Sequence, residues 1–190
     1  MTKRANLEND LKNTRLYDYG VDTDTRTILL FDEKDGELDE SMSYVFHCNM
    51  TILENLSDEP IFIKLNTGGG SITDGKAIID RILASTCEIH IHAVGRICSM
   101  GIYILAAAEV RTSSALTSFM FHESSYDVEG KHSENKSYIK FSDIDEKHLN
   151  RWLATRTKKP ADFWNKLGVG SDYWFLAEEA KTLGLVEEIV

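Results

Sequence analysis

Short apolar runs alternate with longer helical patterns through most of the chain. Four runs rich in branched and aromatic residues predict strands: RTILLF (26–31), IFIKLN (61–66), EIHIHAVG (88–95) and SFMFHE (118–123). Between them, apolar positions recur at helical spacing in 38–56, in 71–83 and in GIYILAAAEV (101–110). Strands that alternate with helices indicate βαβ crossovers, so the pattern predicts an α/β fold with a largely parallel sheet.

Two segments depart from this alternation. Residues 1–16 carry charge without apolar periodicity, which predicts a mobile arm or a segment that becomes ordered on assembly. From about 127 to 167 the sequence is charged and helical, more typical of a protruding helix than of a sheet element, and it would suit an oligomer contact. No repeat or linker divides the remainder, so residues 17–190 are expected to form one domain.

Composition and charge narrow the possible partners. With 190 residues, 42% hydrophobic and 27% charged, the chain has the composition of a soluble globular domain. The net charge of -10 repels nucleic acid and anionic membranes. The start is too polar for a signal peptide and no apolar run could span a bilayer, so we expect a cytoplasmic protein. Three cysteines without CxxC spacing indicate neither a disulfide framework nor a zinc site.

A near match to a phosphate-binding loop begins at Gly70. The residues GSITDGKA (70–77) fit G-x-x-x-x-G-K-[ST] except at the last position. Ala77 lacks the hydroxyl that such a loop places on Mg²⁺, and Ser71, with Asp74 three residues later, resembles a capping box. We therefore expect no nucleotide here.

The same glycines have a second possible use. Gly68, Gly69 and Gly70 follow a predicted buried strand, and without a Cβ they allow backbone N–H groups to face a developing oxyanion. A plain strand-to-helix turn remains the alternative.

Ser99 occupies the next strand-to-helix junction, in GRICSMG (95–101). Ile97 excludes the G-x-S-x-G elbow of the α/β-hydrolases. A hydroxyl at a helix N-terminus could be a nucleophile, with the N–H of Met100 as an oxyanion donor, or simply a helix cap. The junction alone leaves both interpretations open. Cys98 beside it more plausibly packs as a small apolar residue than acts as a thiol nucleophile.

A nucleophilic serine needs a base and an acid that orients the base. His122 is the best base, because it ends a predicted strand and so shares a sheet edge with Ser99 if the strands are parallel. His90 and His92 could resemble two metal ligands, but without a nearby carboxylate or third imidazole no metal site is expected. For the acid, Asp172 lies in an aromatic setting that could bury it, and Asp162 and Asp127 compete.

Taken together, these residues resemble the caseinolytic (ClpP) type of serine peptidase. NTGGGSITDG (66–75) is similar to the family's Asn-Ser-Pro-Gly-Gly-x-x-x-x-Gly turn, and GRICSMG (95–101) to its Gly-x-Ala-Ala-Ser-Met-Gly. FMFHE and AEEAKTLGLVEEI resemble the family's histidine strand and its closing motif. The order and separations agree over about two thirds of the chain.

The resemblance implies Ser99 as nucleophile, His122 as base and Asp172 as the orienting acid, with an oxyanion hole from the N–H groups of Gly70 and Met100. It further implies a crotonase-like α/β fold whose protruding helical handle, about 127–167 here, interlocks two seven-membered rings around a closed chamber. The expected function is then a serine endopeptidase subunit, a homo-oligomer of fourteen copies that hydrolyses polypeptides. No metal or organic cofactor is implied, since ATP acts only through a partner AAA+ unfoldase.

Several positions depart from the family pattern. Gly68 replaces a proline, Cys98 an alanine, and Glu123-Ser124 the usual Gln-Pro. Lys64 stands where members commonly carry an aromatic residue of the apolar docking pocket for the unfoldase. These departures favour, as an alternative, a catalytically impaired ring subunit that acts as scaffold or partner of an active one. A crotonase-type acyl-CoA enzyme is a second alternative, disfavoured by the serine, histidine and aspartate set.

Overall fold

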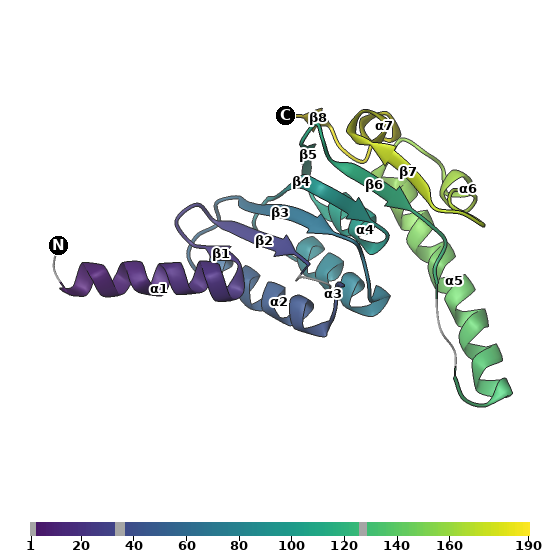
Figure 1. The fold of residues 1–190 in the computed structure, drawn as a ribbon, viewed down its shortest axis with the longest axis horizontal. Coiled ribbons are helices and arrows are strands. Elements are labelled where there is room, and N and C mark those ends of the chain that lie inside the picture. Colours follow the sequence, from purple (N-terminus) through teal and green to yellow (C-terminus); the bar gives the residue numbers. More distant parts are fainter. Residues whose placement is uncertain (1–2, 33–36, 126–128) are drawn as a thin grey trace.

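The chain folds around one twisted sheet (Figure 1). The computed structural model describes residues 3–32, 37–125 and 129–190. In these residues the sheet has eight strands: β1 (Val21–Asp22), β2 (Thr27–Phe31), β3 (Ile61–Thr67), β4 (Ile89–Cys98), β5 (Val110–Ser113), β6 (Ser118–Phe121), β7 (Tyr173–Leu176) and β8 (Glu188–Ile189).

The strand pairing confirms the predicted α/β class. The order is β1-β2-β3-β4-β5-β8, and β6 pairs with both β4 and β7. All pairs are parallel except β1 with β2 and β6 with β7. The four predicted strands correspond to β2, β3, β4 and β6, whereas the other four are only two to four residues long and were not predicted. Val110, placed in a helix by the sequence pattern, begins β5 instead.

Seven helices lie in the described residues: α1 (Lys3–Tyr19), α2 (Glu40–Glu54), α3 (Ile72–Leu83), α4 (Met100–Ala107), α5 (His132–Arg156), α6 (Ala161–Trp164) and α7 (Ala177–Leu183). The expected cap of α3 is confirmed, since the Asp74 N–H donates to Ser71 Oγ at 3.3 Å. Asp39 caps α2 in the same way through the Met42 N–H. None of the described helices combines the length and apolarity that a bilayer span requires.

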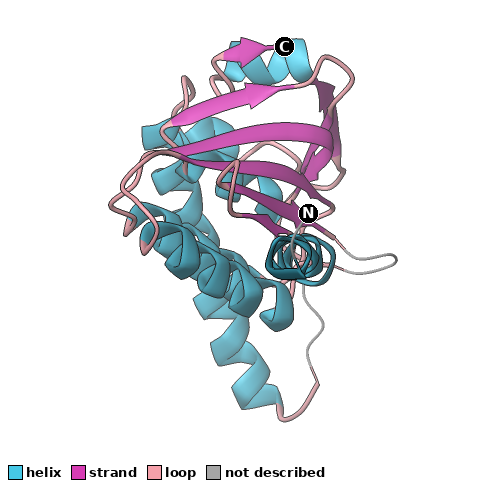
Figure 2. Cartoon of the chain, turned by 90° about the vertical axis from the view of Figure 1, so that its left-hand side faces the viewer, coloured by secondary structure: helices cyan, strands magenta, loops and turns pink. Residues whose placement is uncertain are grey.

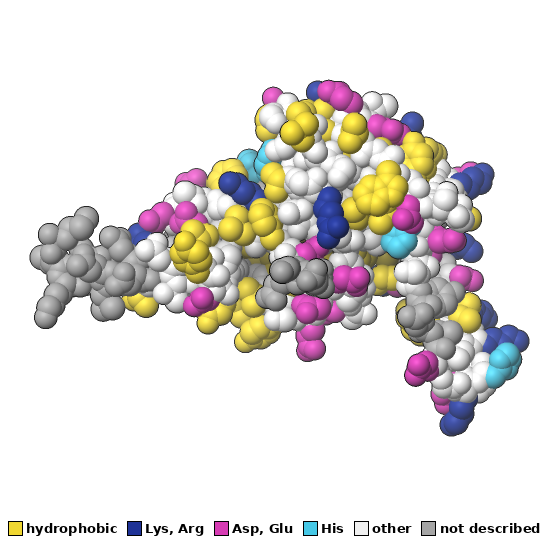
Figure 3. All heavy atoms as spheres, viewed as in Figure 1, with side chains coloured by type: hydrophobic (Ala, Val, Ile, Leu, Met, Phe, Trp, Pro, Cys, Tyr) yellow, Lys and Arg dark blue, Asp and Glu magenta, His cyan; other side chains and the backbone are white. Residues whose placement is uncertain are grey.

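The core lies on the side of the sheet that the helices cover (Figure 2). All eight residues of α4 are buried, consistent with a helix that is apolar on every side. Along β3, Ile61, Ile63 and Leu65 are buried while Phe62 and Lys64 are exposed. Parallel sheets are usually covered on both faces. Here one face of the parallel strands is open within a single chain, and hydrophobic and charged side chains intermix on it (Figure 3).

Helix α5 lies within the region predicted to form a handle, and only its first half projects. Figure 1 shows this half running away from the body of the molecule. In the second half, Leu149, Asn150 and Leu153 are buried. At its end, Arg156 donates to the carbonyls of Ala106, Ala107 and Ala108, so a cation satisfies the C-terminal carbonyls of α4. The handle is therefore anchored directly to the helix that follows Ser99.

The N-terminal segment is helical, which its lack of apolar periodicity did not predict. Helix α1 ends where Gly20, with φ +65, turns the chain into β1. The Gly20 N–H donates to the Leu16 carbonyl, and the Lys12 ammonium pairs with the Asp24 carboxylate at 2.6 Å. That residues 1–16 form a mobile arm stays a prediction.

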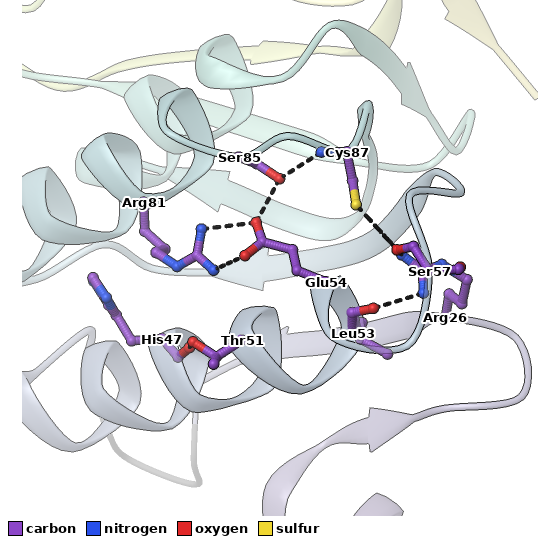
Figure 4. Close-up of polar contacts among 9 residues, drawn as sticks. All are labelled: Arg26, His47, Thr51, Leu53, Glu54, Ser57, Arg81, Ser85 and Cys87. Carbon is purple, nitrogen blue, oxygen red and sulfur yellow. Dashed lines mark hydrogen bonds and ion pairs between the residues drawn. The ribbon is translucent and has the colours of Figure 1, made fainter.

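Partly buried polar contacts surround the ends of α2 and α3 (Figure 4). The Arg26 guanidinium donates to four carbonyls in and after the last turn of α2, those of Leu53, Ser57, Glu59 and Pro60. Nearby, both oxygens of Glu54 accept from Arg81 of α3, and Ser85 donates to the same carboxylate. Two hydrogen bonds from one guanidinium to one carboxylate fix the orientation of both groups, so this pair holds α2 and α3 relative to each other.

Candidate active site

Three predicted site segments meet at one edge of the sheet. The glycine turn (residues 67–71) begins at the end of β3, Ser99 follows β4 directly, and His122 follows β6. Because β3, β4 and β6 are parallel neighbours, their carboxyl ends lie side by side. The Ser99 N–H donates to the Met120 carbonyl of β6 at 2.9 Å, which fixes the two strand ends together.

The geometry of Ser99 does not match that of a side-chain helix cap. Its Oγ makes no capping bond to α4 and instead lies 2.8 Å from His122 Nε2. Its backbone has φ +53 and ψ -122, a conformation that costs a non-glycine residue free energy and clusters at functional sites. A strained turn between strand and helix therefore presents a half-buried hydroxyl to an imidazole. This arrangement is able to activate the hydroxyl as a nucleophile.

The glycine turn leaves one N–H without an acceptor. The Gly69 N–H donates to Thr67 Oγ1 at 2.9 Å, and the Ser71 N–H donates to the Leu38 carbonyl at 2.8 Å. Among the described residues, the Gly70 N–H has no acceptor. Gly70 itself needs to be glycine, since its φ is +143 and an added Cβ would lie 2.5 Å from the Leu38 carbonyl oxygen.

Gly69 brings this turn against the serine. Its φ is +93, and an added Cβ would lie 2.6 Å from the Ser99 Cβ and 3.2 Å from the Met100 nitrogen. The Met100 N–H opens α4 and has no acceptor among the described residues. Free N–H groups at a helix N-terminus favour negative charge. The structure thus places two unused donors, those of Gly70 and Met100, on the two segments that flank Ser99.

Asp172 lies near His122 but not in contact with it. A cavity of about 560 Å³ is lined by both residues, together with Glu123, Ser124, Ser125, Gly168, Gly170 and Ser171. Among the described residues, no hydrogen bond joins Asp172 to His122. Asp172 is exposed, so the expectation that aromatic neighbours bury it is wrong. Tyr173 and Trp174, the residues that suggested burial, are themselves 36% and 57% exposed.

Of the two competing acids, only Asp162 lies within the described residues, and it is engaged elsewhere. Asp162 is exposed and pairs with Lys166 at 2.7 Å, four residues away on the surface. Asp127 lies outside the described residues. Of the two candidates that lie within the described residues, Asp172 is the one that lines a cavity together with His122.

Cys98 packs as predicted, with 2% of its surface exposed. Burial, chiefly, raises the pKa of its thiol; the charges of Asp32 and Asp172 raise it too, and that of Arg96 lowers it. The shift disfavours the thiolate that a cysteine nucleophile requires.

The other polar candidates are engaged elsewhere. Both ring nitrogens of His92 lie within hydrogen-bond distance of hydroxyls, those of Thr112 and Ser114. The expectation that no carboxylate lies near these histidines is wrong for His90, whose Nε2 is 2.7 Å from the Glu88 carboxylate. No cluster of three or more metal-binding side chains occurs in the described part of the chain. Lys76, the lysine of the phosphate-loop pattern, pairs with Asp145 of α5.

Sequence reasoning missed one charged residue at the site. Asp32 follows β2, and its Oδ2 accepts the N–H of Gly68 at 2.5 Å. The two residues are 36 positions apart and meet only because β2 and β3 pair in parallel. The sole sequence signal was a carboxylate directly after a predicted buried strand, at the same sheet edge as the other candidates.

Comparison with known proteins agrees over nearly the whole chain. A family model described as Clp protease matches residues 12–190. ATP-dependent Clp protease proteolytic subunit 2 of Pseudomonas aeruginosa is 31% identical over 159 residues, which cover 82% of this chain and 78% of the relative. Subunit 3 of Rhizobium johnstonii is 30% identical over 172 residues, 87% and 84% of the two chains. The solved structure of a ClpP1 point mutant from Listeria monocytogenes matches with a TM-score of 0.80 at 28% identity, covering 88% and 92%.

Proposed function

Since this chain belongs to the Clp protease family, we propose that it is a serine endopeptidase subunit that hydrolyses peptide bonds of unfolded polypeptides. The observation that supports this most is the 2.8 Å approach of Ser99 Oγ to His122 Nε2 at a strained strand-to-helix turn. Two unused backbone donors, Gly70 N–H and Met100 N–H, belong to the two segments that flank Ser99. Nucleophile, base and oxyanion donors are the parts that acyl transfer requires.

The reaction proceeds in two stages. Ser99 Oγ attacks the carbonyl carbon of the substrate while His122 Nε2 accepts its proton, and the oxyanion receives hydrogen bonds from Gly70 and Met100. His122 then returns the proton to the leaving amine, which leaves an acyl-enzyme on Ser99. A water molecule, deprotonated by His122, hydrolyses this ester. Asp172 orients the imidazole through its other nitrogen, which requires the carboxylate to approach His122 more closely than it does in the isolated chain.

Family membership implies ring assembly in general terms, and we propose rings of seven copies paired through the handle. The projecting half of α5 supports this because it exposes Ile139, Phe141 and Ile144, which are 38%, 60% and 55% exposed. Apolar side chains gathered on a projecting helix are typical of contact surfaces. Cytoplasmic localisation and the absence of nucleic-acid and membrane partners remain predictions from the sequence.

A partner AAA+ unfoldase would supply ATP-driven unfolding. The surface of this chain on which it would dock is polar around Lys64. Lys64 pairs in register with His92 on the adjacent strand, and His92 with Thr112 on the next. Burial, followed by the charge of Lys64, lowers the pKa of His92, so the imidazole is neutral near physiological pH. The expected apolar pocket is therefore replaced around Lys64 by a cation and hydroxyl groups. An unfoldase for this chain would need a more polar docking segment.

A fluorophosphonate tests the proposed function directly, because it phosphonylates only an activated serine. Intact mass would show one adduct per wild-type chain and none on Ser99→Ala, and peptide hydrolysis by that variant would fall by about 10⁴ or more. The oligomer mass of the same samples, measured by light scattering, should be unchanged by the substitution. Peptide cleavage retained by an assembled Ser99→Ala protein would exclude Ser99 as the nucleophile.

The second candidate is a catalytically impaired ring subunit that acts as scaffold or partner of an active one. The observation that favours it is the absence of a bond between His122 and the exposed Asp172 among the described residues. The same labelling experiment separates the two functions. An assembled ring that takes no label by itself, and gains none when mixed with an active subunit, would favour the impaired subunit.

A further inference from the structure

Asp32 is a buried carboxylate that the reaction described above does not use. Only 9% of its side chain is exposed. Its Oδ2 accepts the Gly68 N–H, whereas its Oδ1 is buried and has no partner in the described part of the chain. Burying a carboxylate is costly unless hydrogen bonds compensate. Asp32 therefore requires an explanation, because it is buried beside the proposed oxyanion hole and, among the described residues, only one of its two carboxylate oxygens accepts a hydrogen bond.

The bond from Gly68 completes a pattern in the glycine turn. From Gly68 to Ser71, every N–H has an acceptor within the described residues except that of Gly70. The side chain of Asp32 supplies the first acceptor, two residues before the unused donor. The peptide that carries the Gly70 N–H is held by the Leu38 N–H, which donates to the Gly69 carbonyl at 2.8 Å, while the bond from Gly68 to Asp32 fixes the peptide at the start of the turn. The direction of the Gly70 N–H is thus set before any substrate binds.

The surroundings of Asp32 limit what its charge can do. A carboxylate near a developing oxyanion repels it, so electrostatic stabilisation by Asp32 itself is excluded. Arg96 offsets this charge, with its Nη2 4.0 Å from Asp32 Oδ2. A Cβ on Gly68 would lie 3.1 Å from the same nitrogen and 3.5 Å from Asp32 Oδ2, so the glycine allows the acid and the guanidinium to close over the turn.

We propose that Asp32 is a positioning residue for peptide hydrolysis, which holds the glycine turn by the Gly68 N–H and thereby aims the Gly70 N–H at the oxyanion. This inference rests on the proposed function, because it assigns Asp32 a role in that reaction. Asp32 touches neither the substrate nor the reacting atoms. Its effect should therefore fall on the chemical step, and not on substrate binding.

Steady-state peptide hydrolysis by Asp32→Ala tests the role. We expect kcat to fall about tenfold, less than the ~10²–10³ that loss of an oxyanion donor costs, with KM changed less than about twofold. Asp32→Asn keeps an acceptor oxygen for the Gly68 N–H and should recover most of kcat. Asp58→Ala is the matched control, because it removes an exposed carboxylate and should leave both constants unchanged.

A second variant pair tests the hydrogen bond itself. Gly68 lacks the positive φ of Gly69 and Gly70, so proline is not excluded there by backbone conformation. In Gly68→Pro the proline ring takes the place of the N–H and lies against Asp32 Oδ2. Because the hydrogen bond to Asp32 is lost, kcat should fall. In Asp32→Ala/Gly68→Pro both the acid and the N–H it served are gone. With the acid absent, the proline removes no further bond, so kcat of the double variant should lie close to that of Asp32→Ala and severalfold above that of Gly68→Pro.

The outcomes distinguish this inference from the proposed function. If wild type takes the fluorophosphonate label and Asp32→Ala keeps its kcat, the positioning role is wrong while the proposed function stands. A double variant no better than Gly68→Pro alone also overturns it. If wild type takes no label and cleaves no peptide, the proposed function fails at Ser99, and the role of Asp32 in that reaction fails with it.

Discussion

At Ser99 the backbone conformation and the side-chain chemistry depend on each other. A non-glycine residue with φ +53 costs on the order of 1–3 kcal/mol, which the surrounding structure has to supply. Two bonds hold it there, from the Ser99 N–H to the Met120 carbonyl and from the Ile102 N–H to the Ser99 carbonyl. The strained turn is therefore specified by β6 and α4 together, and the same β6 delivers His122 to the hydroxyl.

Beside the nucleophile, the buried thiol of Cys98 gives a residue-scale prediction. Because burial raises its pKa, the thiolate fraction at neutral pH is small, and alkylation should be slow. Cys48 is exposed and should react first. Iodoacetamide labelling followed by peptide mass spectrometry would measure the two rates, with urea-unfolded protein as the control in which both react. Equal rates in the folded protein would contradict the burial of Cys98.

At the scale of elements, the carboxylate of Glu54 joins the end of α2 to the end of α3. Glu54 accepts from Arg81 and Ser85, and its side chain is 21% exposed. These bonds, chiefly that from Arg81, hold the pKa of Glu54 below its ordinary value of 4.5. A depressed folded pKa means that the stabilisation is present above the unfolded pKa and is lost as pH falls through the folded pKa.

We therefore predict that Glu54→Gln lowers the free energy of unfolding by about 1–3 kcal/mol at neutral pH, since Arg81 loses its charged acceptor. The difference from wild type should shrink as pH falls below the ordinary pKa, because wild type loses the same charge. Urea unfolding at neutral pH and at a pH below 4.5 measures this difference in the free energy of unfolding. Glu59→Gln, which changes an exposed carboxylate, is the control. A difference that does not change with pH would contradict the role of the Glu54 charge.

The elements also show what the sequence could predict. Strands β2, β3, β4 and β6 were found because branched and aromatic residues dominate them, and their parallel order predicted that Ser99 and His122 meet. Short strands such as β7 and β8 have too few residues for a periodic signal. Helix α1 was missed because its sequence has no apolar stripe.

At the candidate site, the sequence predicted which side chains meet only where neighbouring strands position them, as for Ser99 and His122. Asp172 follows a segment in which Gly168 and Gly170 have positive φ, and its position depends on turns that hydropathy does not encode. Its aromatic neighbours suggested burial, but β7 is the outermost strand on its side and pairs only with β6. Asp32 was missed because the sequence does not show which carboxylate a parallel pairing brings to a distant turn.

For the whole molecule, the exposed apolar residues of the handle predict assembly. In Phe141→Asp, a carboxylate placed in the proposed contact should convert paired rings into smaller species, and peptide hydrolysis should fall with them. Native mass spectrometry at several protein concentrations measures the species present. Lys181→Asp puts a carboxylate on the exposed surface of α7, outside the handle, and should leave assembly unchanged. An unaltered mass for Phe141→Asp would exclude the handle as the ring contact.

The pairing of β7 with β6 has a consequence in time. Ser99 and His122 are joined by strands from the middle of the chain, but Asp172 and β7 come from its end. A chain emerging from the ribosome at about 5–20 residues per second folds its earlier segments first. The strands that carry Ser99 and His122 can therefore pair before the segment that supplies Asp172 has been synthesised, so the proposed catalytic centre is completed last on its Asp172 side.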